Sequence, residues 1–101
     1  MSAVAKGRRN QLKARRLLES MGYLVETAKF SRWGSTDFFG IFDLIAIDER
    51  DIKLIQVKTN SMPSPAVREG IEEFPCPPCV SKELWILYDR KMEPRVIKLN
   101  K

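Results

Sequence analysis

The chain has 101 residues, of which 44% are hydrophobic and 31% charged, and its net charge is +5. These values are typical of one soluble globular domain, here spanning residues 1–101. The sequence contains no histidine, which excludes His-based catalytic triads, His-ligated zinc and His general bases. No apolar run approaches the roughly 20 residues that cross a membrane, and the basic N-terminus lacks the apolar stretch of a signal peptide, so we expect a cytoplasmic protein.

The first predicted element is a helix over residues 5–21, which Gly22 ends. Its apolar stripe at helical spacing consists of Ala14, Leu17, Leu18 and Met21. Gln11 lies along the same stripe, so its side chain should point toward the covered side of the helix. A polar residue there is either a hydrogen-bonded boundary residue or part of a functional site.

The same helix is strongly basic, and residues 1–18 contain no acid. The basic residues are Lys6, Arg8, Arg9, Lys13, Arg15 and Arg16. A charge run of one sign is either a solvated helix face or a surface for a polyanion. We favour the second reading, with nucleic acid as the partner.

Residues 23–30 form a strand candidate, and residues 31–40 are expected to be a loop rich in small and aromatic residues. Trp33, Phe38 and Phe39 in that loop could stack on unpaired bases. For each of these aromatics taken singly, packing within the core or the loop is the more common role.

Two strand candidates at about 41–48 and 52–59 carry the most informative residues of the chain. Asp43, Gln56 and Lys58 interrupt strands that are otherwise apolar. An ionised group within a buried strand face needs a partner or a metal, because desolvating its charge is costly. Three such interruptions close together indicate a site, although a solvent-facing Asp, Gln and Lys on an ordinary hairpin would share the pattern.

The turn between these strands predicts their register. If Glu49 and Arg50 form a two-residue loop, then Asp48 pairs with Asp51, and counting back places Asp43 opposite Gln56. Opposed residues share a sheet face and have Cβ atoms about 5 Å apart. Lys58 should lie one pleat further along the same face.

The second half of the chain predicts a helix and two strands. Ser64 is a candidate N-cap before Pro65, and the helix should run to about Phe74 with Val67 and Ile71 facing inward. The strand at 83–88 is apolar enough to be central, and the one at 95–99 alternates like an edge strand.

The two cysteines, Cys76 and Cys79, stand in a proline-rich loop. They supply too few ligands for a zinc site, and the motif is not placed at the start of a helix, where a redox pair is expected. We expect loop cysteines with a structural role or none.

These features together resemble the PD-(D/E)XK nuclease superfamily, in particular its archaeal-type Holliday junction resolvases. Asp43 matches the family's first acid, and Gln56-Val57-Lys58 matches its acid-x-Lys motif with Gln in place of the acid. Lys6-Gly7 and Gly22-Tyr23 frame the position of a helical Glu, which is Gln11 in this sequence. The resemblance covers residues 5–60 and implies a restriction-endonuclease-like α/β fold with a central mixed five-stranded sheet flanked by helices, in the order αβββαββ.

The resemblance also implies a metal-dependent DNA endonuclease that hydrolyses phosphodiester bonds in branched or structured DNA. Asp43, Gln56 and the Val57 carbonyl would bind Mg²⁺ or Mn²⁺, Lys58 would orient the attacking water or offset charge on the phosphate, and Gln11 would hold a metal-bound water. The DNA contacts would come from Lys6, Arg8, Arg9, Arg15 and a loop serine, Ser31 or Ser35.

A second reading follows from the same residues. Because Gln11 and Gln56 replace acids, the fold could instead be a catalytically degenerate module that binds DNA, or a subunit of a larger nucleic-acid complex. Metal-dependent cleavage distinguishes the two. The sequence leaves a monomer and a homodimer both open.

Overall fold

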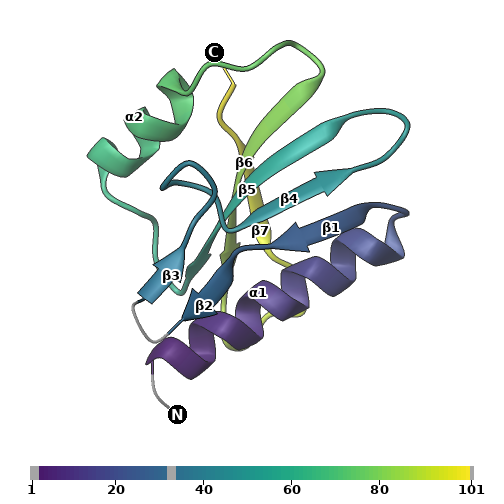
Figure 1. Ribbon diagram of the computed structural model, residues 1–101. Coiled ribbons are helices and arrows are strands. Elements are labelled where there is room, and N and C mark those ends of the chain that lie inside the picture. Colours follow the sequence, from purple (N-terminus) through teal and green to yellow (C-terminus); the bar gives the residue numbers. More distant parts are fainter. Residues whose placement is uncertain (1–2, 32–33, 101) are drawn as a thin grey trace.

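The computed structural model describes residues 3–31 and 34–100 and has an α/β fold with a mixed five-stranded sheet at its centre (Figure 1). The strands lie in the order β1-β4-β5-β6-β7, where β5 and β6 are parallel and the other pairs are antiparallel. The elements are α1 Ala3–Ser20, β1 Leu24–Thr27, β4 Leu44–Ile47, β5 Ile52–Thr59, α2 Pro65–Glu73, β6 Val80–Leu87 and β7 Arg95–Lys98. The predicted fold class and the predicted order of these seven elements are confirmed.

The segment between β1 and β4 differs from the prediction of one strand and a loop. The strand expected over residues 23–30 is divided at Ala28, and the chain continues as β2 (Lys29–Ser31), which pairs with β3 (Gly34–Thr36) in a separate two-stranded sheet. Ala28 itself stays attached to β4, since its N–H donates to the Asp43 carbonyl at 2.8 Å. Trp33 lies outside the described residues.

Helix α1 covers one face of the sheet and ends as its sequence predicts. Gly22 has a φ of +97°, and the N–H groups of Gly22 and Tyr23 donate to the carbonyls of Glu19 and Leu18. This is the Schellman arrangement, which favours glycine at the left-handed position. The core beneath α1 contains Ala14, Leu18, Tyr23, Leu44, Ala46, Ile55, Trp85 and Leu87.

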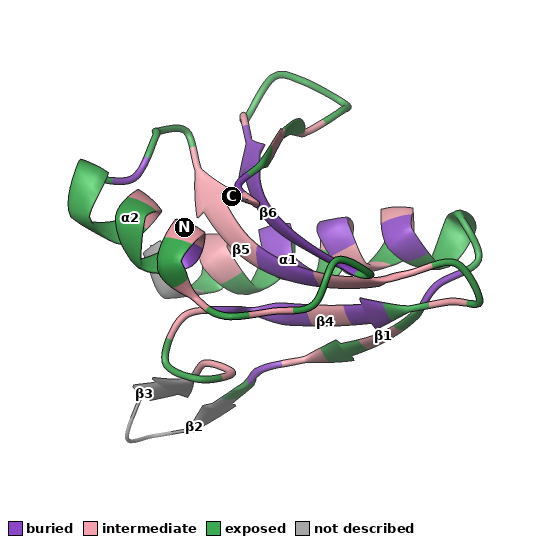
Figure 2. Ribbon diagram, turned by 90° about the horizontal axis from the view of Figure 1, so that it is seen from above, coloured by how far each residue is buried: buried purple, intermediate pink, exposed green. Residues whose placement is uncertain are grey.

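Helix α2 lies on the opposite face and contributes less to the core (Figures 1 and 2). Its predicted start is confirmed, because the Ser64 side chain accepts from the Val67 N–H and Pro65 is the first helical residue. The prediction that Val67 faces inward is wrong, since it is 39% exposed, whereas Ile71 is fully buried. Ile71 is the one buried residue of this short helix, so only its last turns reach the sheet.

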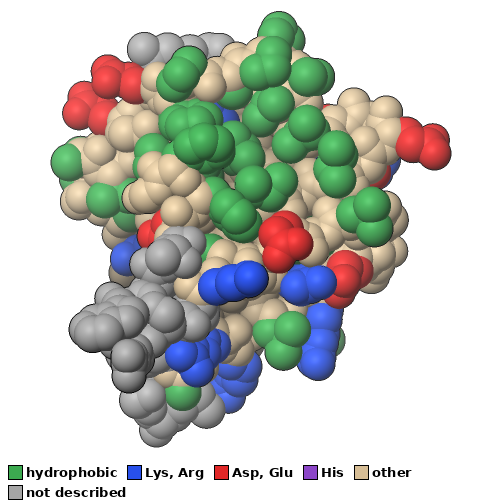
Figure 3. All heavy atoms as spheres, viewed as in Figure 1, with side chains coloured by type: hydrophobic (Ala, Val, Ile, Leu, Met, Phe, Trp, Pro, Cys, Tyr) green, Lys and Arg blue, Asp and Glu red, His purple; other side chains and the backbone are tan. Residues whose placement is uncertain are grey.

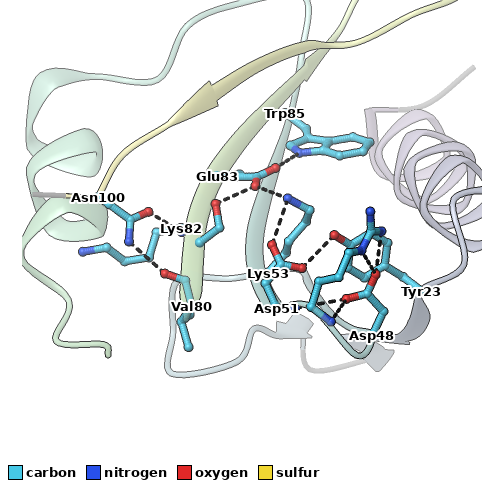
Figure 4. Close-up of polar contacts among 11 residues, drawn as sticks. Tyr23, Asp48, Asp51, Lys53, Val80, Lys82, Glu83, Trp85 and Asn100 are labelled. Carbon is cyan, nitrogen blue, oxygen red and sulfur yellow. Dashed lines mark hydrogen bonds and ion pairs between the residues drawn. The ribbon is translucent and has the colours of Figure 1, made fainter. Parts of the chain in front are cut away.

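Strand β6 is central, as predicted, and every one of its residues is buried. Two of these residues are charged. The Lys82 ammonium donates to the carbonyls of Glu72 and Phe74 and so neutralises the C-terminal end of α2. The Glu83 carboxylate accepts from Ser81, Lys53 and Trp85, as Figure 4 shows. Each buried charge therefore has its partners, as burial requires.

Candidate metal and nuclease site

The candidate site lies where β4 separates from β5. The predicted register is confirmed over the paired residues, from Ile47 with Ile52 to Leu44 with Ile55. The pairing stops at Leu44, and the Asp43 N–H donates to the Ile55 carbonyl at 2.8 Å. The continued register had predicted that Asp43 pairs with Gln56. That pairing is absent, because the ladder ends one residue earlier.

The Asp43 side chain accepts a main-chain hydrogen bond that a continued ladder would have made. Its Oδ2 accepts the Val57 N–H at 2.8 Å. In an extended strand the N–H and C=O of one residue lie along the same edge. The Val57 carbonyl consequently faces the same gap beside Asp43, and its role as a metal ligand stays a prediction.

Helix α1 closes the site from one side. The Gln11 amide donates to Asp43 Oδ1 at 3.1 Å, and both side chains are buried, with 7% and 8% exposed. One residue earlier, the Asn10 amide donates to Thr59 Oγ1 at 2.7 Å and fixes the helix on the end of β5. The expectation that Gln11 points to the covered side of the helix is confirmed.

Electrostatics at Asp43 are unusual for an aspartate. Its pKa is raised to about 6, chiefly by burial and also by the nearby Asp37 carboxyl, whereas the Val57 N–H and the Lys58 ammonium act to lower it. The Asp43 carboxyl thus lies close enough to one other acid, Asp37, and to one lysine, Lys58, for their charges to act on it.

Asp37 was missed by the sequence analysis, which treated it as part of a loop. Phe38 and Phe42 form an isolated antiparallel bridge, so the next pair outward along the two chain segments is Asp37 with Asp43. The available signal was the spacing of these two acids on either side of a tight turn that contains Gly40, whose φ is +70°.

Two of the predicted site residues carry buried oxygen atoms that lack hydrogen bonds. Within the described part of the chain, Gln11 Oε1 and Gln56 Oε1 are buried and have no partner. An unpaired buried acceptor costs roughly 1–3 kcal/mol. Carboxylate, amide and main-chain oxygens are the ligands that hard divalent cations prefer, so the donor set fits Mg²⁺ or Mn²⁺. No three His, Cys, Asp or Glu side chains cluster among the described residues, so a cation would depend on amide and carbonyl oxygens as well.

The predicted DNA-contacting residues differ in their contacts and in how exposed they are. Lys6 forms an ion pair with Asp89 at 2.6 Å, and Arg15 contacts Glu19 and Thr27. Arg8 and Arg9 are exposed on the N-terminal half of α1. Lys and Arg side chains gather in the lower part of the molecular surface in Figure 3. Ser35 belongs to β3, but the structure describes only its backbone.

Three comparisons place this geometry among known proteins. No family model matches the chain, and no curated protein matches it. Among solved structures, it is similar to Hjc from Archaeoglobus fulgidus, described as a Holliday junction resolvase from an archaeal hyperthermophile. The match has a TM-score of 0.69 and 17% identity, and covers 93% of this chain and 73% of that one. This likeness shows that the two share a fold. No helix of the described chain is long and apolar enough to span a membrane.

The raised pKa of Asp43 predicts a stability gain from Asp43→Asn in EDTA. Between pH 3.8 and 6 the folded protein keeps a proton that the unfolded chain releases, so stability falls as pH rises and stays low above pH 6. The neutral amide avoids this loss, up to about 3 kcal/mol. Its oxygen could accept from Val57 and its NH₂ could donate to Gln11 Oε1.

Thermal melts from pH 3.5 to 8 measure the effect. The difference in Tm between Asp43→Asn and wild type should grow from pH 4 to 6 and then level off. The exposed turn substitution Glu49→Gln serves as the control and should give a difference that does not vary with pH in this way. A constant difference for Asp43→Asn would contradict the burial of an ionising carboxyl.

Proposed function

We propose that this protein is a divalent-cation-dependent endonuclease that cleaves branched DNA. The observation that carries the proposal is the Asp43 carboxylate, bound by Gln11 and Val57, together with the buried Gln11 Oε1, which has no partner among the described residues. The buried charges of β6, Lys82 and Glu83, have hydrogen-bond partners, which sets this cluster apart from them. Its position on a fold shared with a junction resolvase supports the choice of reaction.

Each residue would have a separate task in phosphodiester hydrolysis. Asp43, the Val57 carbonyl and the Gln56 amide oxygen would hold the cation, which when bound supplies a Lewis acid and lowers the pKa of water. Gln11 would orient Asp43 through its hydrogen bond and present its free oxygen to a bound water. Lys58 would place positive charge beside the phosphate and stabilise the charge that develops there.

The DNA backbone would lie along the N-terminal half of α1. Arg8 and Arg9 are the exposed cations there, and Asn10 and Gln11, which follow them, hold the helix against the site. We assign Lys6 and Arg15 a smaller part than the sequence suggested, because both are half-buried whereas Arg8 and Arg9 are exposed. Phosphate contacts of this kind orient DNA without reading its sequence.

A DNA-binding module without activity is the second candidate. The specific observation in its favour is that Gln11 and Gln56 occupy positions that carry acids in the family that the sequence resembles. Both candidates predict the same DNA affinity, and only the nuclease predicts metal-dependent cleavage. The sequence left a monomer and a homodimer both open, and the same preparations can distinguish them.

The decisive assay uses purified protein with Mg²⁺ or Mn²⁺ and labelled duplex, single-stranded, flap and four-way-junction DNA. We expect cleavage of the branched substrates and its loss in Asp43→Ala, because the anchoring ligand is removed. DNA binding should be retained or tighter, since an anion near the phosphate is lost. Glu49→Gln, the matched control, should cut like wild type. Equal cleavage by Asp43→Ala would refute the site, and metal-independent binding without cleavage would favour the inactive module.

A second experiment tests the path of the DNA. Replacing Arg8 and Arg9 together by Ala should weaken binding to every DNA shape and reduce the slope of log K against log salt by roughly 0.9 for each lost phosphate contact. The matched control replaces Arg50 in the β4–β5 turn and Lys98 in β7 by Ala. This double variant loses the same amount of charge, but away from α1. Titrations at several salt concentrations should leave the control's slope unchanged. If both double variants change the slope equally, α1 is not the DNA surface.

The turn that joins the two acids supplies a candidate for branch recognition. Phe38 is half-buried against the α2 side of the core, whereas Phe39 is 70% exposed. Phe39 has a φ of +56°, a strained conformation for a bulky residue, and its ring rests against Phe74 with centroids 5.1 Å apart. An aromatic ring held out beside the site is suited to stacking on a base that has lost its partner.

Phe39→Ala should therefore lower affinity for junction or flap DNA but not for intact duplex. Stacking is worth roughly 1–3 kcal/mol per base, so the loss should be about tenfold or more. Phe39→Tyr keeps an aromatic face and should bind like wild type. Fluorescence anisotropy with the three proteins and both DNA classes measures this, and an equal loss on duplex would assign Phe39 to packing.

A further inference from the structure

The turn from Asp37 to Asp43 has a defined backbone geometry. Phe38 and Phe42 exchange both hydrogen bonds, with N–H to carbonyl distances of 2.8 and 3.0 Å. In an antiparallel pair, the position next to such a hydrogen-bonded pair is a non-hydrogen-bonded one, where opposed side chains come closest. That position holds Asp37 and Asp43. The two acids therefore flank this bridge on neighbouring chain segments.

The surroundings make two close carboxylates unfavourable without a cation. Asp43 is 8% exposed, and two like charges near each other in such a place disfavour ionisation of both. Gln11, itself 7% exposed, donates its NH₂ to Asp43 and leaves its buried Oε1 without a partner in the described structure. Acids and a free amide oxygen converge here, which is a composition suited to a positive ion.

We propose that Asp37 is the second anionic ligand of the cation site and supplies the charge that Gln11 and Gln56 do not carry. This inference rests on the proposed function, because it concerns the same site. Asp37 and Asp43 together carry a charge of −2, which matches one divalent cation. Mg²⁺ is commonly bound by one or two carboxylates, with waters and substrate phosphates completing its shell.

A purely structural role for Asp37 makes a different prediction. The Asp37 carbonyl accepts from the Gly40 N–H at 3.1 Å, and this main-chain contact forms the turn whatever the side chain is. Asp37→Asn retains that contact, the side-chain size and the capacity for hydrogen bonds, and removes only the charge. The substitution thus separates a ligand from a turn residue.

The experiment measures Mn²⁺ binding to the DNA-free protein, by electron paramagnetic resonance of free Mn²⁺ and by the rise of Tm on adding Mn²⁺. Asp37→Asn should weaken Mn²⁺ at least about tenfold and reduce that rise, while its Tm in EDTA equals or exceeds that of wild type. Glu49→Gln should behave like wild type. Asp37→Asn combined with Gln56→Glu returns the charge to the site and should recover most of the affinity.

The outcomes separate this inference from the proposed function. If wild type and Asp37→Asn bind Mn²⁺ equally and wild type cleaves branched DNA, the role of Asp37 is wrong and the nuclease stands. If binding depends on Asp37 but no DNA is cut, the ligand assignment stands and the nuclease is wrong. If wild type does not bind Mn²⁺ at all, both are wrong.

Discussion

The site depends on one hydrogen bond. The Val57 N–H donates to the Asp43 carboxylate instead of to a carbonyl of the neighbouring strand. If β4 continued to pair with β5, Val57 would be bound within the ladder and its carbonyl would be consumed. Because the ladder ends at Leu44, a carboxylate, a main-chain oxygen and the Gln11 amide lie at the opening between β4 and β5. The remaining ladder, from Leu44 to Ile47, holds this opening in place. The site is thus a consequence of where pairing stops.

The buried polar groups at the two ends of the sheet differ in how fully they are hydrogen-bonded. At one end, Glu83 accepts from three donors and Lys53 has two carboxylates within 4 Å, so the polar groups are satisfied (Figure 4). At the other end, Gln11 and Gln56 keep buried oxygens without partners, and Asp43 is poorly solvated. A satisfied network rigidifies a core, whereas an unsatisfied one stores free energy that a ligand can release. This contrast within one sheet is why we interpret only the second end as a binding site.

Sequence reasoning predicted the elements well because local signals agree with the packing. Gly22, Ser64 and the Asp48–Asp51 turn each fix an element boundary through their own backbone chemistry. It failed where long-range contacts decide. Asp37 has no apolar periodicity around it and becomes a neighbour of Asp43 only when the Phe38–Phe42 bridge closes. Likewise, Lys6 looked free until the fold brought Asp89, many residues away in the chain, against it.

Gln rather than an acid at positions 11 and 56 would have a physical advantage at the proposed site in so small a protein. A domain of this size has a modest core and little stability to spare for unpaired buried charges. Carboxylates at positions 11, 37, 43 and 56 would repel one another whenever the cation is absent. Two amides keep the oxygen donors while limiting the buried charge to Asp43 and its neighbour Asp37, which lies on a turn and is only half-buried. The affinity for the cation would then come more from oxygen atoms that the fold already holds in place than from total negative charge. The folded protein would also remain stable without the metal.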